Sequence, residues 1–303
     1  MKYSECDLHE LEFSLRYMAV RSARVARKLR GRTKNIPKNR PDGTPEPLTD
    51  GDLESHRCFV REFHELPEGF GCVGEEEDLR IECTFEDAEV RITFDAVDGT
   101  KVYAADYVFG STVMIALVVN DQVVAAYIAD INSGDVFGYG PSTSEVRRWR
   151  DFDVARAGGE PLSTEFPGSL KDQPILLRNE REDYPPRVAA IARSTKHSGG
   201  IFSRYVSCDS GVSIGLSMVQ LLCGHVGALV MASKRWSPWD DTPLIGLAKA
   251  MGMVFLRPIS DGTTLEEFEP PLVEEVAPRD YVIFVVHRSS AAALQEGYAA
   301  AVL

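Results

Sequence analysis

Apolar residues recur along the chain with two periods, which predict an alternation of helices and strands. Apolar positions at helical spacing between Leu8 and Ala19 indicate a first helix from about residue 7 to residue 29. The residues Thr49-Asp50-Gly51-Asp52 favour the start of a second helix, with Asp52 as its cap. The run VRITFDAV at 90–97 alternates apolar and polar residues instead, which is the period of a strand.

Two longer apolar runs, FGSTVMIALVV and QVVAAYIADI, are separated by Asn120-Asp121 and predict a β-hairpin. GDVFGYG indicates a short strand after them, and strands and helices then alternate through the second half. The expected strands are ILLR, YVSC, ALVMA, MVFL and YVIFVV, and the expected helices lie around residues 186–193, 211–224, 240–251 and 290–302. This alternation predicts an α/β protein with mixed sheets.

A stretch rich in glycine, proline and serine, residues 140–173, separates the two halves. We expect it to divide the chain into two lobes. The N-terminal α/β lobe would comprise residues 1–145, and the C-terminal α/β lobe residues 146–303.

Composition and charge narrow the class of partner. The chain has 303 residues, of which 44% are hydrophobic and 26% charged, as in an ordinary globular protein. Its net charge of −13 argues against binding to a nucleic-acid polymer or an anionic membrane. The longest apolar runs are too short to span a membrane, and the acidic N-terminus lacks the apolar core of a signal peptide. The six cysteines form no CxxC pair, which is typical of reduced thiols, so we expect a cytoplasmic protein.

Residues 21–40 depart from this acidic balance, because they include nine lysines and arginines and no acidic residue. The segment is either a solvated helix end and loop or a cationic rim that attracts an anionic substrate.

The stretch FDAVDGT at residues 94–100 places two carboxylates at the end of a predicted strand. One chemistry with a similar pattern is that of the haloacid dehalogenases, whose DxDGT motif supplies a nucleophile and an acid two residues apart, on one side of the strand. Here Ala96 and Val97 both intervene, so the pair would be misaligned for that mechanism.

The second chemistry is a metal site. Asp95 and Asp98 would offer the oxygen ligands that Mg²⁺ prefers, and Gly99-Thr100 would open a short helix whose N–H groups meet a phosphate. Two aspartates alone are too few for such a site. Further carboxylates are available in three places: Asp52, the pair Glu75-Glu76 after an apolar strand, and Asp240 before an amphipathic helix.

Taken in order, these motifs resemble the signature of the inositol monophosphatase superfamily of metal-dependent, lithium-sensitive phosphatases. That signature is D, then GEE, then DP(I/L)DGT, then WD followed by eleven residues and GG. In this chain it runs through Asp52, Gly74-Glu75-Glu76, Asp95 to Thr100, and Trp239-Asp240 with Gly252-Met253 after eleven residues. The resemblance covers roughly residues 45–255 and implies a layered αβαβα sandwich with two mixed sheets.

The resemblance implies a set of metal ligands for two or three Mg²⁺ ions. Glu75, Asp95 and the carbonyl of Val97 would hold a first ion. Asp95, Asp98 and Asp240 would hold a second, and Glu75 would assist a third, weaker one. Asp240 would thus be supplied by the C-terminal lobe and the other ligands by the N-terminal lobe.

The resemblance also implies how water and substrate are held. Thr100, backed by Asp52 or Glu75, would orient the attacking water, and the N–H groups of Gly99 and Thr100 would bind phosphate. The other residues expected to contact phosphate or substrate are Lys101, Ser213, Lys234 and Arg235. The implied partners are a small phosphorylated substrate and a second copy of the chain in a homodimer.

The chain departs from the family pattern at three places. Ala96 stands where the motif has proline, Met253 stands where it has its last glycine, and Ser233-Lys234-Arg235-Trp236 contains no acidic group to hold inositol hydroxyls. Lys101 and the segment Arg193 to His197 favour instead a 3′(2′),5′-bisphosphate nucleotidase or a histidinol-phosphatase of the same superfamily. A non-enzymatic alternative is a regulatory relative that binds phosphate ligands and has weak catalysis.

Overall fold

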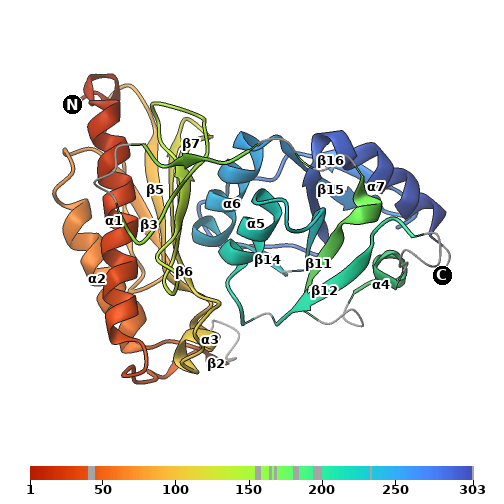
Figure 1. The fold of residues 1–303 in the computed structure, drawn as a ribbon. Coiled ribbons are helices and arrows are strands. Elements are labelled where there is room, and N and C mark those ends of the chain that lie inside the picture. Colours follow the sequence, from red (N-terminus) through yellow and green to blue (C-terminus); the bar gives the residue numbers. More distant parts are fainter. Residues whose placement is uncertain are drawn as a thin grey trace.

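The computed structural model describes residues 1–39, 45–153, 158–163, 166, 169–179, 184–193, 200–209, 211–232 and 234–301. These residues form five layers, in which helices and sheets alternate (Figure 1). The helices of the three helical layers are α1 (Leu8–Leu29) with α2 (Asp50–Phe63), then α5 (Ile214–Leu222) with α6 (Pro238–Ala250), then α4 (Pro186–Arg193) with α7 (Arg288–Ala300). The mixed α/β class and the layered sandwich expected from the sequence are therefore confirmed.

The first sheet has eight strands in the order β10-β9-β8-β7-β6-β5-β3-β4. Neighbouring strands are antiparallel except for β3 and β5, which run parallel. The strands are β3 (Gly71–Gly74), β4 (Arg80–Ile81), β5 (Val90–Asp98), β6 (Thr112–Val119), β7 (Gln122–Asp130), β8 (Val136–Tyr139), β9 (Arg147–Trp149) and β10 (Glu160–Pro161). The short helix α3 (Thr100–Ala104) directly follows β5.

The second sheet has six strands in the order β12-β11-β13-β18-β15-β16, of which the first three are parallel. The strands are β11 (Pro174–Arg178), β12 (Arg204–Cys208), β13 (Ala228–Met231), β15 (Met253–Pro258), β16 (Leu265–Phe268) and β18 (Ile283–His287). Two small ribbons complete the fold, β1 (Lys38–Asn39) with β2 (Pro45–Glu46) and β14 (Arg235–Trp236) with β17 (Ala277–Pro278). Short 3₁₀ turns cover Tyr3–Glu5 and Leu170–Asp172.

Three apolar cores hold the layers together. The first packs α1 and α2 on one face of the first sheet, with Phe59 stacked on Phe94. The second packs α5 and α6 between the two sheets, where Met114 of β6 and Met253 of β15 belong to one cluster. The third packs α4 and α7 on the outer face of the second sheet, with Phe284 against Tyr298. Because the second core takes side chains from both sheets, the two halves of the chain share a hydrophobic interior.

The long elements lie where the periodicity predicts them. Asn120 and Asp121 both have positive φ, 47° and 60°, the geometry of a tight hairpin turn between β6 and β7. The first sheet continues through β9 and β10 to Pro161, beyond the expected division at residue 145. The two-lobe division stays a prediction.

One expected helix cap is wrong. Thr49, and not Asp52, is the N-cap of α2, and its side chain accepts from the N–H groups of Gly51 and Asp52. The Asp52 carboxylate in turn accepts from the Thr49 N–H, which completes a capping box. Both residue types favour helix starts, so composition alone does not separate these two positions. Among the described helices, none has the length and apolar character needed to cross a membrane.

Candidate metal centre

A β-bulge brings Asp95 and Asp98 to the same side of β5. Asp95 pairs with Met114 on the neighbouring strand and Asp98 with Thr112, so three steps on β5 match two steps on β6. In a regular strand, residues three apart point to opposite faces, and one extra residue restores a common face. The D-x-x-D spacing that excludes a dehalogenase arrangement is therefore compatible with a shared carboxylate site.

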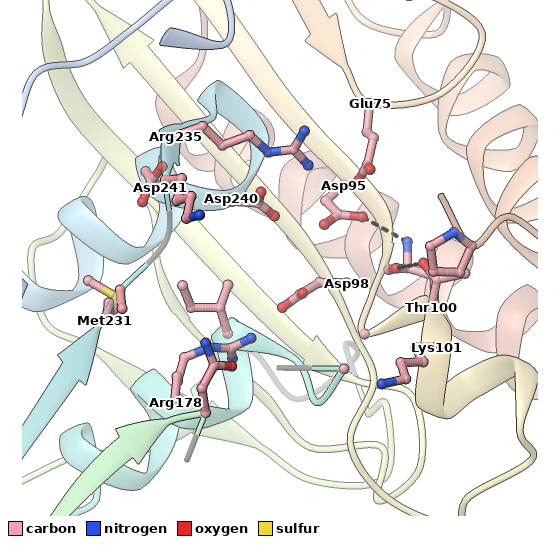
Figure 2. Close-up of a pocket in the computed structure, with 18 residues that line it drawn as sticks. Glu75, Asp95, Asp98, Thr100, Lys101, Arg178, Met231, Arg235, Asp240 and Asp241 are labelled. Atoms are coloured by element: carbon pink, nitrogen blue, oxygen red, sulfur yellow. Dashed lines mark hydrogen bonds between the residues drawn. The ribbon is translucent and has the colours of Figure 1, made fainter. Parts of the chain in front are cut away.

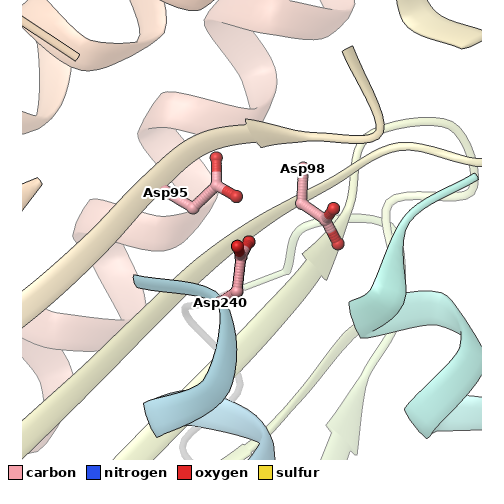
Figure 3. A group of neighbouring side chains, drawn as sticks. All are labelled: Asp95, Asp98 and Asp240. Atoms are coloured by element: carbon pink, nitrogen blue, oxygen red, sulfur yellow. The ribbon is translucent and has the colours of Figure 1, made fainter. Parts of the chain in front are cut away.

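Asp240 joins these two aspartates from the middle layer of the molecule. It lies in the first turn of α6, whose N-cap is Ser237. One oxygen from each of Asp95, Asp98 and Asp240 lies within 4.8 Å of the others, and the three side chains lie next to one another (Figure 3). Asp240, 142 positions after Asp98 in the sequence, thus completes one carboxylate cluster with the two aspartates of β5.

The carboxylate cluster is electrostatically unfavourable as it stands. Burial and the Glu75 carboxylate raise the pKa of Asp95 well above its usual value. Burial and then the Asp98 carboxylate raise the pKa of Asp240 to about 7. One Asp95 oxygen accepts from the Val97 N–H at 2.9 Å, but the other, Oδ2, is buried without a hydrogen-bond partner. Three neighbouring carboxylates, one of them buried with an unsatisfied oxygen, fit a bound cation, which would supply the missing charge and ligand contact.

Asp98 is held by the start of α5. It accepts hydrogen bonds from the Ser213 hydroxyl at 2.5 Å and from the Gly215 N–H at 2.9 Å. Ser213 is fully buried and also lies 2.7 Å from the Thr112 hydroxyl. The Ser213 hydroxyl thus holds Asp98 in place, and the expected contact of Ser213 with substrate stays a prediction.

Thr100 and Asp52 form a second polar group beside the carboxylate cluster. The Thr100 hydroxyl lies 3.0 Å from Asp52 Oδ1 and 2.8 Å from the Val97 carbonyl oxygen, so its single proton serves one of them at a time. Burial raises the pKa of Asp52 to about 6. The three residues come from α2, β5 and α3, and Val97 directs its carbonyl toward Thr100.

Gly99 makes the tight passage from β5 into α3 possible. Its φ is +87°, a left-handed conformation, and a Cβ there would lie 2.4 Å from the carbonyl oxygen of Gly110. A side chain at this position would be both strained and blocked. The expected short helix after the glycine is present as α3.

Glu75 directly follows β3, next to β5 in the sheet. Its N–H donates to the carbonyl of Phe94 at 3.2 Å, which sets Glu75 beside Asp95. Glu76 turns away to a different partner, since its carboxylate accepts from Lys38 at 3.0 Å. Lys38 is the member of the basic segment that approaches this region. Arg40 and the segment 194–199 lie outside the described residues.

The carboxylate cluster opens into a cavity of about 680 Å³ between the two sheets. Figure 2 shows Glu75, the carboxylate cluster and Thr100 on its wall, with Lys101, Arg178 and Arg235 around them. Lys234 and the glycine N-cap of α3 also line it. The structure thus brings together Glu75, Asp95, Val97, Asp98, Gly99, Thr100, Lys101, Lys234, Arg235 and Asp240, and it places Asp52 directly behind Thr100.

The sequence does not single out two residues of this region, Arg178, which lines the cavity, and Arg279, which supports α6. Arg178 is the last residue of β11, and a charged residue at the carboxyl end of an apolar parallel strand is the signal that marks it. Arg279 is buried, 3.6 Å from Asp241, and it stacks over Trp236 at 4.5 Å. No pattern in the sequence indicates this contact, because it joins the tail of the chain to α6.

The comparisons with known proteins agree with this fold. A model of the inositol monophosphatase family matches residues 7–302. The extragenic suppressor protein suhB of Bartonella henselae has 15% identity and a TM-score of 0.67, over 94% of this chain and 96% of its own. The IMPase of Thermotoga maritima has 16% identity and a TM-score of 0.66, over 95% of this chain and 96% of its own. SuhB of Mycobacterium tuberculosis has 16% identity and a TM-score of 0.66, over 97% of this chain and 97% of its own. No curated protein sequence matches the chain.

Proposed function

Since this chain belongs to the inositol monophosphatase family, we propose that it is a Mg²⁺-dependent phosphomonoesterase that hydrolyses a small phosphorylated metabolite by attack of a metal-activated water. The family is one of phosphatases, and the finer statements about metal, water and substrate are our proposal. The observation that supports it best is the carboxylate cluster, in which Asp95 is buried with an unsatisfied oxygen and Asp98 and Asp240 are half-buried.

The ligands of the proposed Mg²⁺ ions are these three aspartates, Glu75 and the carbonyl of Val97. Bound there, the ions would supply Lewis acidity and lower the pKa of a coordinated water. The chain contributes the geometry. The bulge in β5 holds Asp95 and Asp98 on one side, and the donors from α5 fix Asp98.

Thr100 and Asp52 orient the attacking water in this proposal. The Thr100 oxygen accepts a hydrogen bond from the water while the hydroxyl donates to Asp52 Oδ1. The water proton then passes by way of Thr100 to the Asp52 carboxylate, which is largely ionised above its pKa of about 6. The N–H groups of Gly99 and Thr100 hold the phosphate, with Lys101 beside them.

The proposal extends to properties of the whole enzyme. We expect two or three Mg²⁺ ions per site, inhibition by Li⁺, a homodimer and a cytoplasmic location. Lys234 and Arg235 line the cavity and are expected to contact the substrate. Two cations there favour a substrate with more than one anionic group, as in the bisphosphate nucleotidase alternative. The histidinol-phosphatase alternative predicts hydrolysis of histidinol phosphate, and the regulatory alternative predicts Mg²⁺ binding without turnover.

A phosphate-release panel tests the proposal. The substrates are inositol 1-phosphate, adenosine 3′,5′-bisphosphate, fructose 1,6-bisphosphate and histidinol phosphate, each with Mg²⁺ and with or without Li⁺. We expect turnover of at least one, dependent on Mg²⁺ and lost on addition of a chelator. If no substrate is turned over and calorimetry detects no Mg²⁺ binding, the enzymatic proposal is wrong. Mg²⁺ binding without turnover would favour the regulatory relative.

A further inference from the structure

The segment 269–276 connects the second sheet to the first. It begins directly after β16, the edge strand of the second sheet. Further along, the Arg80 guanidinium of β4 donates to the Glu274 carbonyl at 3.2 Å and lies 3.4 Å from the Glu275 carboxylate. The Glu274 carboxylate lies 2.6 Å from Nη1 of Arg91 in β5. Two ion pairs therefore fix this part of the tail to β4 and β5 of the first sheet.

Arg91 depends on its carboxylate partner more than an exposed arginine would. Its side chain is only 11% exposed, and its Nε is buried without a hydrogen-bond partner. Taking a guanidinium out of water is costly unless acceptors satisfy it. Glu274 is the closer of two carboxylates, since Glu89 lies 3.9 Å away, and its hydrogen bond with Arg91 lowers the pKa of Glu274. The ion pair with Glu274 thus offsets the cost of the guanidinium and ties segment 269–276 to β5.

Strand β5 carries both Arg91 and the first residue of the carboxylate cluster, Asp95. Val90, Ile92 and Phe94 point into the first core, so the residues between them face the other side of the sheet. Arg91 and Asp95 belong to this second set and lie four residues, or about 13 Å, apart along the strand. Helix α6 contacts β5 and lies between the two sheets (Figure 1).

Segment 269–276 leads directly into the support of Asp240. It continues as β17, which pairs with β14. The residue after β14 is Ser237, the N-cap of α6, whose hydroxyl accepts from the Asp240 N–H at 3.4 Å. Figure 2 shows Arg235 of β14 on the same side of the cavity as Asp240. A short path of paired strands therefore links the ion pair of Arg91 to Asp240.

A separate contact holds the same ribbon against α6. Arg279 follows β17, stacks on Trp236 of β14 at 4.5 Å and lies 3.6 Å from Asp241 of α6. This contact joins the β14–β17 ribbon to the helix, whereas the Arg91–Glu274 ion pair joins the ribbon to the sheet. Of the two, the ion pair is the one that relates the start of α6 to β5.

We propose that the Arg91–Glu274 ion pair is a positioning contact, which holds segment 269–276 on β5 and so places Asp240 against the aspartates at the end of the same strand. The inference rests on the proposed function, because it takes these aspartates as ligands of one Mg²⁺ site. Neither Arg91 nor Glu274 is among the described residues that line the cavity, so both act through the position of Asp240. A ligand that is held in place before the metal binds loses less conformational entropy on binding.

Calorimetry of Mg²⁺ binding measures the effect on the site. Glu274→Gln should weaken Mg²⁺ binding by about tenfold or more, as loss of a group that orients a metal ligand does. Arg91→Lys keeps the charge and should bind Mg²⁺ nearly as the wild type does. The double variant Arg91→Gln/Glu274→Gln should lose no more affinity than Glu274→Gln, because the ion pair is already broken. Glu266→Gln, which breaks an ion pair with Arg257 inside the second sheet, is the matched control and should leave the affinity unchanged.

Hydrogen exchange of the metal-free protein tests the contact without Mg²⁺. In Glu274→Gln, the backbone N–H groups of residues 235–242, which cover β14 and the first turn of α6, should exchange several-fold faster than in the wild type. Those of residues 112–119 in β6 should keep their rates. Unchanged exchange in residues 235–242, or an equal rise in both segments, overturns the inference.

The two measurements separate this inference from the proposed function. Faster exchange confined to residues 235–242, with no Mg²⁺ binding by the wild-type protein, would support the positioning contact and contradict the metal site. Mg²⁺-dependent hydrolysis with equal Mg²⁺ affinity in Glu274→Gln and the wild type would support the phosphatase and overturn the inference.

Discussion

Asp95 has one oxygen that accepts from a backbone N–H and one buried oxygen that has no partner. Such a carboxylate costs the folded protein free energy unless a cation or a proton satisfies it. The neighbouring Glu75 and Asp240 carboxylates increase that cost. The residue is therefore difficult to explain as structural, and its presence is consistent with a ligand role.

Replacement of this residue by its amide gives the first prediction. Asp95→Asn should lower activity by at least about 100-fold, because a metal ligand is lost. The metal-free variant should be as stable to heat as the wild type or more so, since a buried charge is removed. Steady-state kinetics checks the activity, Mg²⁺ calorimetry checks the loss of the metal ligand, and thermal unfolding checks the stability.

Asp121→Asn is the matched control for this change. Asp121 is exposed in the β6–β7 turn, and asparagine tolerates its positive φ. The activity of the Asp121→Asn variant should stay at the wild-type level. An Asp95→Asn enzyme with full activity would mean that Asp95 holds no catalytic ion.

Thr100 gives the second prediction, through its contact with Asp52. Thr100→Val removes the hydroxyl and should lower kcat about 100-fold or more, while Thr100→Ser should keep most of it. Because Asp52 must be ionised to accept the proton and its pKa is about 6, wild-type kcat should fall as the pH drops below about 6. A profile of kcat against pH checks this fall at acidic pH. The fall should be absent from the residual activity of Asp52→Asn.

At the scale of single residues, the sequence indicates which side chains form the carboxylate cluster but not how they are arranged. Asp95, Asp98 and Asp240 can be recognised from their motifs, yet the bulge that aligns the first two depends on pairing with β6 and leaves no local signal. Ser213 gives a second example. Its hydroxyl caps α5 and holds Asp98, 115 positions away, and nothing in the sequence around Ser213 indicates this contact.

Helix α6 places Asp240 in the carboxylate cluster, and its first turn depends on the tail of the chain. The carboxylate of Asp241 accepts from the Ser237 N–H at 2.7 Å and lies 3.6 Å from the buried Arg279 guanidinium. The β14–β17 ribbon holds Arg279 in place. The tail, which has no counterpart in the recognised motifs, thus supports the start of the helix that carries the proposed metal ligand Asp240.

The third prediction removes this support. Arg279→Met should destabilise the protein by about 3–5 kcal/mol, because it leaves the Asp241 carboxylate buried without its cation. The double variant Arg279→Met/Asp241→Asn should recover a large part of the loss. Denaturant unfolding of the metal-free protein measures both. Equal losses in the single and double variants would mean that the two side chains are not coupled.

The elements themselves follow closely from periodicity where they are long. Helix α1 and the β6–β7 hairpin contain many apolar positions in phase, so the pattern is strong. Several strands that were not predicted, such as β9, β14 and β17, have only two or three residues, and each exists because a partner strand is brought to it by the rest of the fold. Such pairing is decided by tertiary structure, which local patterns do not contain.

The carboxylate cluster joins two layers of the molecule, the first sheet and the middle helices. In the metal-free protein, its charges oppose this contact. The folded state holds the pKa of Asp240 at about 7, above the 3.8 of an ordinary aspartate. The folded protein therefore binds this proton more tightly than the unfolded chain does, and the associated stability is present at low pH and lost as the pH rises through about 7.

The fourth prediction follows from that sign. The thermal midpoint of the chelator-treated protein should fall by several degrees between about pH 5.5 and pH 8, and saturating Mg²⁺ should remove most of the decline. Exposed aspartates with lowered pKa, such as Asp7 and Asp87, titrate below this window and do not reverse it. Differential scanning calorimetry of Asp240→Asn checks whether this residue causes the decline. The thermal midpoint of that variant should depend less on pH.

The middle core, which takes apolar side chains from both sheets, has a consequence for the way the protein denatures. Neither sheet keeps a complete interior once the other is lost, because α5 and α6 need both faces. The two halves therefore depend on each other as a single cooperative unit, although a Gly- and Pro-rich stretch separates them in sequence. Unfolding curves recorded by circular dichroism and by tryptophan fluorescence should coincide in one transition, because the tryptophans lie in the first sheet (Trp149), in α6 (Trp239) and in β14 (Trp236).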